Sequence, residues 1–237
     1  MVFDWSFCPL ETFLYRLVFV LGCVLICITV HEFGQAKMAK HLGDRLVTLL
    51  RRDTLDPVVH IDPLWTLGLP AALVVLASLT GSPNVPFIAL GMHVWYNPLD
   101  VHGRAFGMGW SPRGAQWLIA VVGPLSNTAM ALFCFGLAAL TLKLGLAQLG
   151  TFSAADFLIQ LAYLNVTFAI FHLLPIFPLD GARIWPGFFR NRTKMNFYVI
   201  RPWISVTLTA VLVLGGGSWI AILARFITQH MIAALSG

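Results

Sequence analysis

The stretch Cys27-Ile-Thr-Val-His-Glu-Phe-Gly-Gln-Ala-Lys-Met-Ala-Lys-His41 decides the fold, because it closes an apolar run that begins at Phe13. A helix of this composition enters lipid. Near its far end the run carries His31 and Glu32 side by side. Ionisable side chains inside a membrane helix indicate a functional site, because they are costly to place in lipid. The stretch therefore predicts both a membrane protein and the position of its site.

The residues that follow His31 indicate the kind of site. In the helix of a zinc peptidase the pattern is His-Glu-x-x-His, in which two histidines one turn apart bind the metal and the glutamate activates a water molecule. Here His31 and Glu32 occupy the first two positions, and Gln35 occupies the fifth. The pattern is that of a metal-binding helix in which one ligand has been replaced.

The composition of the chain excludes a soluble globular domain. Hydrophobic residues make up 58% of the 237 residues and charged residues only 11%, whereas charged residues are about a quarter of soluble domains. The apolar runs are continuous and close to the ~20 residues that cross a bilayer, unlike the short alternating segments of a barrel. We therefore expect an all-α polytopic membrane protein. The net charge of +5 records orientation in the membrane rather than binding to nucleic acid.

We expect about five or six transmembrane helices in a single membrane domain over residues 1–237. The N-terminal run stays as the first span, because Asp4 and Glu11 occupy the place of the basic region of a cleavable signal. The last apolar region is too long for one untilted span, so it is either a tilted helix or a hairpin that turns at Gly215-Gly-Gly217. The expected helical segments are 12–41, 65–80, 114–142, 155–174 and 203–235.

The second of these segments decides the topology. Asp180 follows the fourth expected helix and His31 lies near the end of the first, so the two meet only if both helices run the same way. That requires residues 65–96 to enter the membrane as a helix and to return as an extended re-entrant segment, which is tolerated where protein buries it or it lines a wet cavity. All the basic residues then fall on one side except Arg16, Lys143 and Arg225. The positive-inside rule makes that side cytoplasmic, so we expect a multi-pass protein of the cytoplasmic (inner) membrane with its site near the cytoplasmic face.

Three stretches stand in order near the ends of the expected helices. They are Val30-His-Glu-Phe-Gly-Gln35, Gly123-Pro-Leu-Ser-Asn127 and Leu173-Leu-Pro-Ile-Phe-Pro-Leu-Asp-Gly181. Together they resemble the site-2 protease family of intramembrane zinc metallopeptidases, over about residues 30–184. The stretch that links the first two is similar to the compact subgroup without extra soluble domains.

The resemblance implies a role for four residues. His31 and Asp180 match zinc ligands, Glu32 matches the general base, and Asn127 matches the polar residue near the site. It also implies a site-2-protease-like core, zinc as cofactor, and a transmembrane protein as substrate.

Three positions depart from the family pattern. Gln35 stands where the second zinc histidine belongs. His172, eight residues before Asp180, stands where the family usually has asparagine. The expected extended segment differs over residues 89–97.

These departures leave two interpretations of the site. An amide oxygen is a weaker ligand than imidazole, so His31 and Asp180 alone would bind zinc poorly. His172 restores three ligands if it faces the metal, and otherwise it is a hydrogen-bonded histidine between helices. Asn127 is likewise either a substrate contact or an interhelical hydrogen-bonding residue.

Two functions follow from these interpretations, and the sequence leaves open whether the protein is an enzyme. The first is a divergent intramembrane zinc metallopeptidase that hydrolyses peptide bonds of transmembrane substrates. The alternative is a catalytically inactive pseudopeptidase that serves as a binding or accessory subunit of a membrane complex. The expected partners are thus a transmembrane substrate or a membrane-complex subunit, together with lipid, and not nucleic acid.

Overall fold

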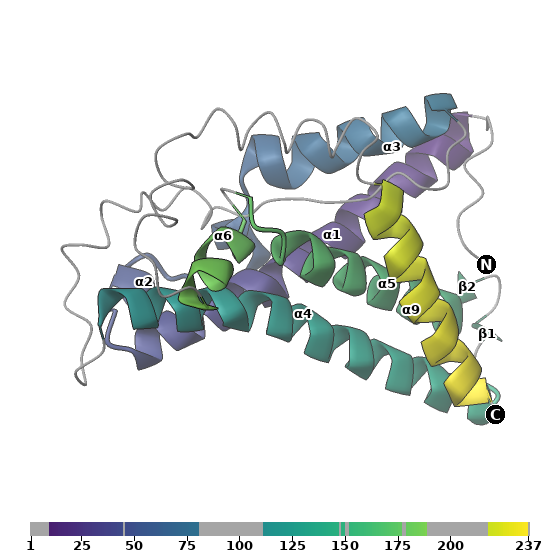
Figure 1. Ribbon diagram of the computed structural model, residues 1–237. Helices are drawn as coiled ribbons and strands as arrows, with labels where there is room; N and C mark the ends of the chain where they lie inside the picture. Colours follow the sequence, from purple (N-terminus) through teal and green to yellow (C-terminus); the bar gives the residue numbers. More distant parts are fainter. Residues whose placement is uncertain are drawn as a thin grey trace.

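The computed structural model describes residues 10–44, 46–80, 111–146, 148–149, 152–176, 179–188 and 218–236, and these are almost entirely helical (Figure 1). Three helices are long and apolar enough to cross a membrane: α1 (Leu10–His41), α4 (Pro112–Lys143) and α5 (Ala154–His172). The all-α membrane fold is therefore confirmed, and these helices match the expected segments to within two residues at each end. The expected re-entrant strand and residues 203–217 of the last apolar region lie outside the described residues.

The remaining elements are short, apart from the helix near the C-terminus. The expected helix over 65–80 is present and opens as a π-helical turn. It begins after Asp62, because the Asp62 carboxylate accepts hydrogen bonds from the amides of Leu64 and Trp65, both at 2.9 Å. The short elements are α2 (Leu46–Leu49), η1 (Pro57–His60), η2 (Pro63–Gly68), α3 (Leu69–Thr80), β1 (Gln148–Leu149), β2 (Phe152–Ser153), α6 (Gly181–Ile184) and η5 (Trp185–Phe188), and α9 (Ser218–Ser236) follows them.

Serine hydroxyls fix where the two central helices begin. Ser111 accepts a hydrogen bond from the amide of Gly114 at 3.1 Å, and Ser153 accepts one from the amide of Asp156 at 3.1 Å. Each hydroxyl satisfies an amide that would otherwise lack a partner in the first turn. Strands β1 and β2 pair antiparallel between the two helices, so α4 and α5 run in opposite directions.

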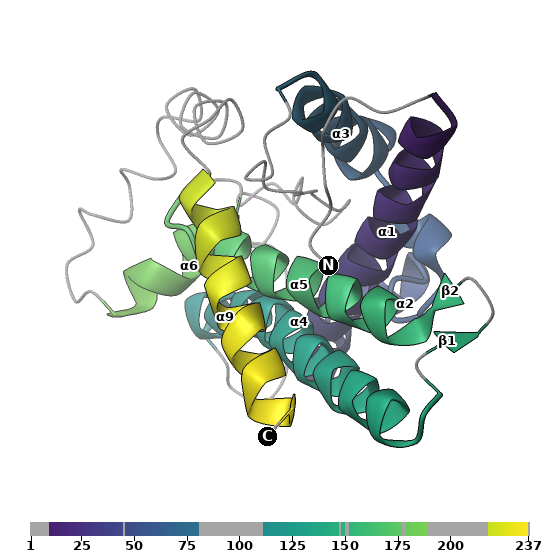
Figure 2. The same cartoon turned by 90° about the vertical axis from the view of Figure 1, so that its right-hand side faces the viewer.

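Helix α5 lies at the centre of the molecule. Of the 18-residue apolar stretch that could cross a membrane, 67% is buried inside the protein in α5, compared with 35% in α1 and 39% in α4. It packs against α4, α9 and α1, as Figures 1 and 2 show from two directions. Its Phe168 and Phe171 are fully buried in the main core. The residues on α5 are therefore held on several sides, which suits a site that needs fixed geometry.

The directions of the helices agree with the requirement that His31 and Asp180 meet. In Figure 1, α1 and α5 run the same way, and α4 runs the opposite way. Helices α3 and α4 both begin at the end of the molecule where α1 finishes (Figure 1). The end of α5 is thereby brought beside the second half of α1.

Candidate metal centre

Four buried side chains from two distant parts of the chain meet where α1 passes the end of α5. Helix α1 contributes His31 and Gln35, which lie one turn apart on the same face. Helix α5 ends with His172, and Asp180 directly precedes α6. Their exposed fractions are 1% for His31, 2% for Gln35, 1% for His172 and 4% for Asp180. The structure thus gathers residues from two of the three family-like stretches.

The Asp180 carboxylate is the centre of the cluster. His31 Nε2 lies 2.8 Å from Oδ2 of Asp180, and His172 Nδ1 lies 3.1 Å from the same oxygen. Gln35 Nε2 donates to the other oxygen, Oδ1, at 2.8 Å. The rings of His31 and His172 lie with their centroids 4.1 Å apart. Three side chains therefore converge on a single carboxylate.

His31, His172 and Asp180 fit a metal ion. One ligand atom from each lies within 4.8 Å of the others, while ligand atoms in a tetrahedral zinc site are roughly 3.4 Å apart, given bonds of about 2.0–2.2 Å. His31 Nδ1 and His172 Nε2 are buried and have no hydrogen-bond partner among the described residues. Two imidazoles and a carboxylate are a donor set that zinc accepts. Small side-chain rotations would bring the three into bonding range.

Gln35 lies one turn after His31 and contacts both His31 and Asp180. Its Nε2 lies 3.3 Å from His31 Nε2 while it donates to Asp180. An amide nitrogen does not bind metal, and a half-turn of the amide would present a neutral oxygen instead. Gln35 therefore orients the Asp180 carboxylate, and at most it supplies a weak fourth donor.

Asp180 is held in its ionised form. Burial raises the pKa of its carboxyl, but the imidazoles of His31 and His172 beside it outweigh burial and hold that pKa well below its usual range. Arg183 Nη1 lies 3.7 Å from Asp180 Oδ1 and places a positive charge beside the carboxylate. The carboxylate is the form that binds metal.

The predicted base and the predicted polar residue lie in different surroundings. Glu32 is 1% exposed, and its carboxyl is close enough to His172 to act on that ring electrostatically. Asn127 on α4 is fully buried, and among the described residues neither its Nδ2 nor its Oδ1 has a hydrogen-bond partner. Asn127 thus stands apart from the hydrogen bonds that join the other side chains to Asp180.

Gly123 is a site residue that the sequence analysis missed. A Cβ at this position would lie 2.5 Å from His31 Nε2 and 2.5 Å from Gln35 Nε2, so the backbone of α4 itself forms one wall of the cluster. A glycine in an apolar membrane helix lets the backbones of two helices approach closely, and Gly123 lies one turn before Asn127 on α4. The Gly-Pro-x-x-Asn stretch therefore bears on the site through its glycine as well as its asparagine.

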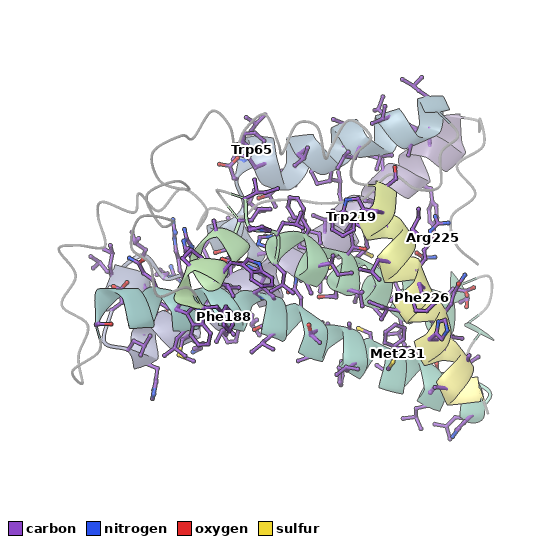
Figure 3. The ribbon with its side chains drawn as sticks, in the orientation of Figure 1. Trp65, Phe188, Trp219, Arg225, Phe226 and Met231 are labelled. Atoms are coloured by element: carbon purple, nitrogen blue, oxygen red, sulfur yellow. The ribbon has the colours of Figure 1, made fainter. Side chains whose placement is uncertain are left out.

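Two tryptophan hydrogen bonds hold the turn that carries Asp180. Trp185 Nε1 donates to the carbonyl of Leu173 at 2.7 Å and so links η5 back to the end of α5. Trp117 on α4 donates to the carbonyl of Ile184 at 3.1 Å. Its ring also packs edge-on against Phe188, which lies beside α4 in Figure 3. The segment after Asp180 is thereby fixed between α5 and α4.

A buried His-His-Asp cluster inside a helical membrane protein is the kind of site that metallopeptidases use, and the similar sequences carry names of that kind. The chain is 31% identical over 163 residues to "Putative zinc metalloprotease YwhC" of Bacillus subtilis, a match over 68% of this chain and 64% of that protein. It is 30% identical over 164 residues to "Putative zinc metalloprotease Rip2" of Mycobacterium tuberculosis, over 69% of this chain and 54% of that protein. The chain thus spans less than two thirds of the length of either relative.

Two other comparisons gave no match. No family model matches the chain, and no solved structure matches it. The similarity to the two metalloproteases supports a metalloprotease-like protein and suggests zinc. The names of these relatives do not bear on Gln35 or His172, so the consequences of those two residues rest on the geometry.

Proposed function

We propose that this protein is an intramembrane zinc metallopeptidase whose third zinc ligand has moved from position 35 to His172. One observation carries the proposal: ligand atoms of His31, His172 and Asp180 lie within 4.8 Å of one another, and all three residues are buried. The names of the similar proteins support the choice of zinc. In this proposal His172 replaces the ligand that the sequence lacks at Gln35.

Each residue of the site has a distinct task. Zinc held there would supply a Lewis acid and would lower the pKa of a bound water to about 7. His31, His172 and Asp180 hold the ion, and Gln35 keeps the Asp180 carboxylate turned toward the two rings. Glu32 is the general base, which takes a proton from the attacking water and returns it to the leaving amine. Asn127 would hydrogen-bond the peptide backbone, which would satisfy its unpaired amide.

The depth of the site supports a transmembrane substrate. His31 lies ten residues before the end of α1, which is about 15 Å along a helix. A peptide bond that reaches this depth belongs to a chain already inside the bilayer. With the basic residues on the cytoplasmic side, cleavage would occur near the cytoplasmic face of the inner membrane.

A second candidate function rests on the hydrogen bonds of Gln35. Because Gln35 Nε2 donates to Asp180 at 2.8 Å, the cluster also forms a hydrogen-bonded link between α1 and the segment after α5 without any metal. Such a link suits a pseudopeptidase that binds a partner in a membrane complex. In that case Glu32 would have no catalytic task.

Zinc stoichiometry and cleavage, measured on the same preparations, separate the two functions. The full chain, purified in detergent without added chelator, is analysed for metal and incubated with a model transmembrane substrate. We expect about one zinc per chain, loss of zinc in His172→Asn, and retained zinc with loss of cleavage in Glu32→Gln. His172→Asn is informative because it installs the residue that the family usually has.

The matched control is His60→Asn. His60 is also buried, at 1% exposed, but its Nε2 lies 3.0 Å from the carbonyl of Thr54 and it is not part of the His31–His172–Asp180 group. Unchanged zinc in His172→Asn would remove His172 from the ligand set. Metal-free wild-type protein with no Glu32-dependent cleavage would favour the pseudopeptidase.

A further inference from the structure

An apolar groove runs between α1 and α4 on a side of α1 that the metal centre does not use. Its volume is about 600 Å³, within the usual range of ligand sites. From α1 it is lined by Val30, Phe33 and Met38, and from α4 by Val122, Met130 and Phe133. At 3.6 residues per turn, the centre of this lining lies roughly 100° around α1 from His31 and Gln35. The groove is therefore separate from the proposed catalytic face.

The floor of the groove is a close contact between the two helices. A Cβ on Gly34 would collide with the hydroxyl of Ser126, so the backbones approach closely there. Ser126 Oγ donates to the carbonyl of Val122 at 2.8 Å, so its hydrogen is used within α4. The hydroxyl hydrogen of Ser126 is therefore not available to a ligand, and the rest of the floor is apolar.

The charge of the groove is confined to one end. Among the described residues, the ionisable side chains that line the groove are Lys37 and His41, both near the end of α1, and none is acidic. The Lys37 ammonium lies 5.1 Å from the centre of the Phe33 ring, and it forms no ion pair within the part of the chain that the structure describes. Lys40, three residues further on, pairs with Asp53 at 2.6 Å. Lys37 therefore offers a positive charge at one end of an open apolar groove.

We propose that this groove binds one acyl chain of an anionic phospholipid, with the phosphate of the headgroup at Lys37. From Lys37 back to Val30 the groove follows about 10 Å of helix α1, so it would hold part of an acyl chain in a leaflet whose hydrocarbon core is about 15 Å deep. An amphiphile with a negative head and an apolar tail matches both the charge at Lys37 and the apolar lining. A transmembrane helix, about 10 Å across, would cover the groove without placing an anion at Lys37.

The orientation agrees with the distribution of lipids. Lys37 lies at the end of α1 that leads into the basic loop, the side that we propose to be cytoplasmic. The cytoplasmic leaflet carries the anionic lipids, and each Lys or Arg near that surface is worth about 1 kcal/mol of attraction. The lipid would stabilise the α1–α4 pair without taking part in hydrolysis.

The test measures lipid bound to the full-length protein. The purified chain is titrated in detergent with phosphatidylglycerol or with phosphatidylcholine of the same acyl length, and the bound lipid is counted by native mass spectrometry. We expect about one tightly bound phosphatidylglycerol per chain and about fivefold weaker binding of phosphatidylcholine. Equal binding of both lipids by the wild type would overturn the role of Lys37.

Paired variants locate the lipid. Lys37→Ala should abolish the preference for phosphatidylglycerol, whereas Lys40→Ala, whose ammonium is paired with Asp53, should retain it. Ala129→Phe fills the groove and should reduce binding of both lipids. Leu132→Phe adds a ring at an exposed position of α4 outside the groove and should change neither. If Ala129→Phe binds lipid as the wild type does, another occupant covers the groove and the proposal fails.

Discussion

The two halves of the candidate metal centre are built differently. His31 and Gln35 lie on one continuous helix, where the spacing alone puts them on the same face. His172 and Asp180 lie on either side of the break between α5 and α6, and hydrogen bonds from Trp185 and Gln35 fix where Asp180 lies. The α1 half supplies one of the three candidate ligands, His31, and the half at the end of α5 supplies the other two, His172 and Asp180. The comparison shows that three candidate ligands meet although the continuous helix supplies only one of them.

The largest effect is expected from removing the residue that joins the halves. Asp180→Ala leaves two imidazoles and an amide buried without their common acceptor, and breaking a buried charged cluster costs about 3–5 kcal/mol. We expect a large fall in thermal stability in detergent together with complete loss of bound metal. Asp56→Ala is the control, because Asp56 is exposed and caps a short turn through Val58. An Asp180→Ala protein as stable as the control would show that the cluster does not hold the two halves together.

A methyl group at Gly123 tests the α1 half without removing a ligand. A Cβ there would lie 2.5 Å from His31 Nε2 and Gln35 Nε2, and overpacking of this kind costs about 1–3 kcal/mol. Gly123→Ala should therefore lower both stability and zinc affinity. The same change at Gly136, further along α4 with no atom within 4 Å of the added Cβ, should be neutral or stabilising by up to about 1 kcal/mol. Equal effects at the two glycines would contradict a wall formed by α4.

These two predictions also show what the sequence could supply. The helices, their approximate ends and the shared face of His31 and Gln35 follow from apolar runs and helical spacing. The approach of His172 to Asp180 could be proposed only as one of two alternatives, because the path of the chain through Pro175 and Pro178 does not follow from spacing. The close passage of α4 at Gly123 and the hydrogen bond from Trp185 are tertiary contacts between segments far apart in sequence. No local pattern fixes such contacts.

Restoring the family ligand tests whether one half can compensate for the other. Gln35→His places an imidazole one turn after His31, on the same face, so the α1 half regains its two ligands. We expect Gln35→His to bind zinc more tightly than the wild type. We also expect the double variant Gln35→His/His172→Asn to bind zinc, although His172→Asn alone loses it. Zinc stoichiometry of the wild type, both single variants and the double variant measures this. If the double variant stays metal-free, the position of Gln35 cannot support a ligand in this protein.

The smallest effect is expected from the hydrogen bond that holds the Asp180 turn. Trp185→Phe keeps an aromatic ring but removes the N–H that donates to the Leu173 carbonyl at 2.7 Å, a loss of about 0.5–1.5 kcal/mol. Trp219, which Figure 3 labels on α9, gives a matched control in Trp219→Phe. Its exposed fraction is 44%, nearly the same as the 43% of Trp185. Since Asp180 lies inside the segment that the Trp185 bond closes, the lost energy should appear as a several-fold weaker zinc affinity, with a similar change in thermal stability in detergent.

His31 is on α1 and is not held by this bond, so the double variant Trp185→Phe/Gln35→His should recover zinc affinity through the α1 half. A zinc affinity unchanged in Trp185→Phe, with only stability reduced, would mean that the turn is fixed by Gln35 and the two histidines alone.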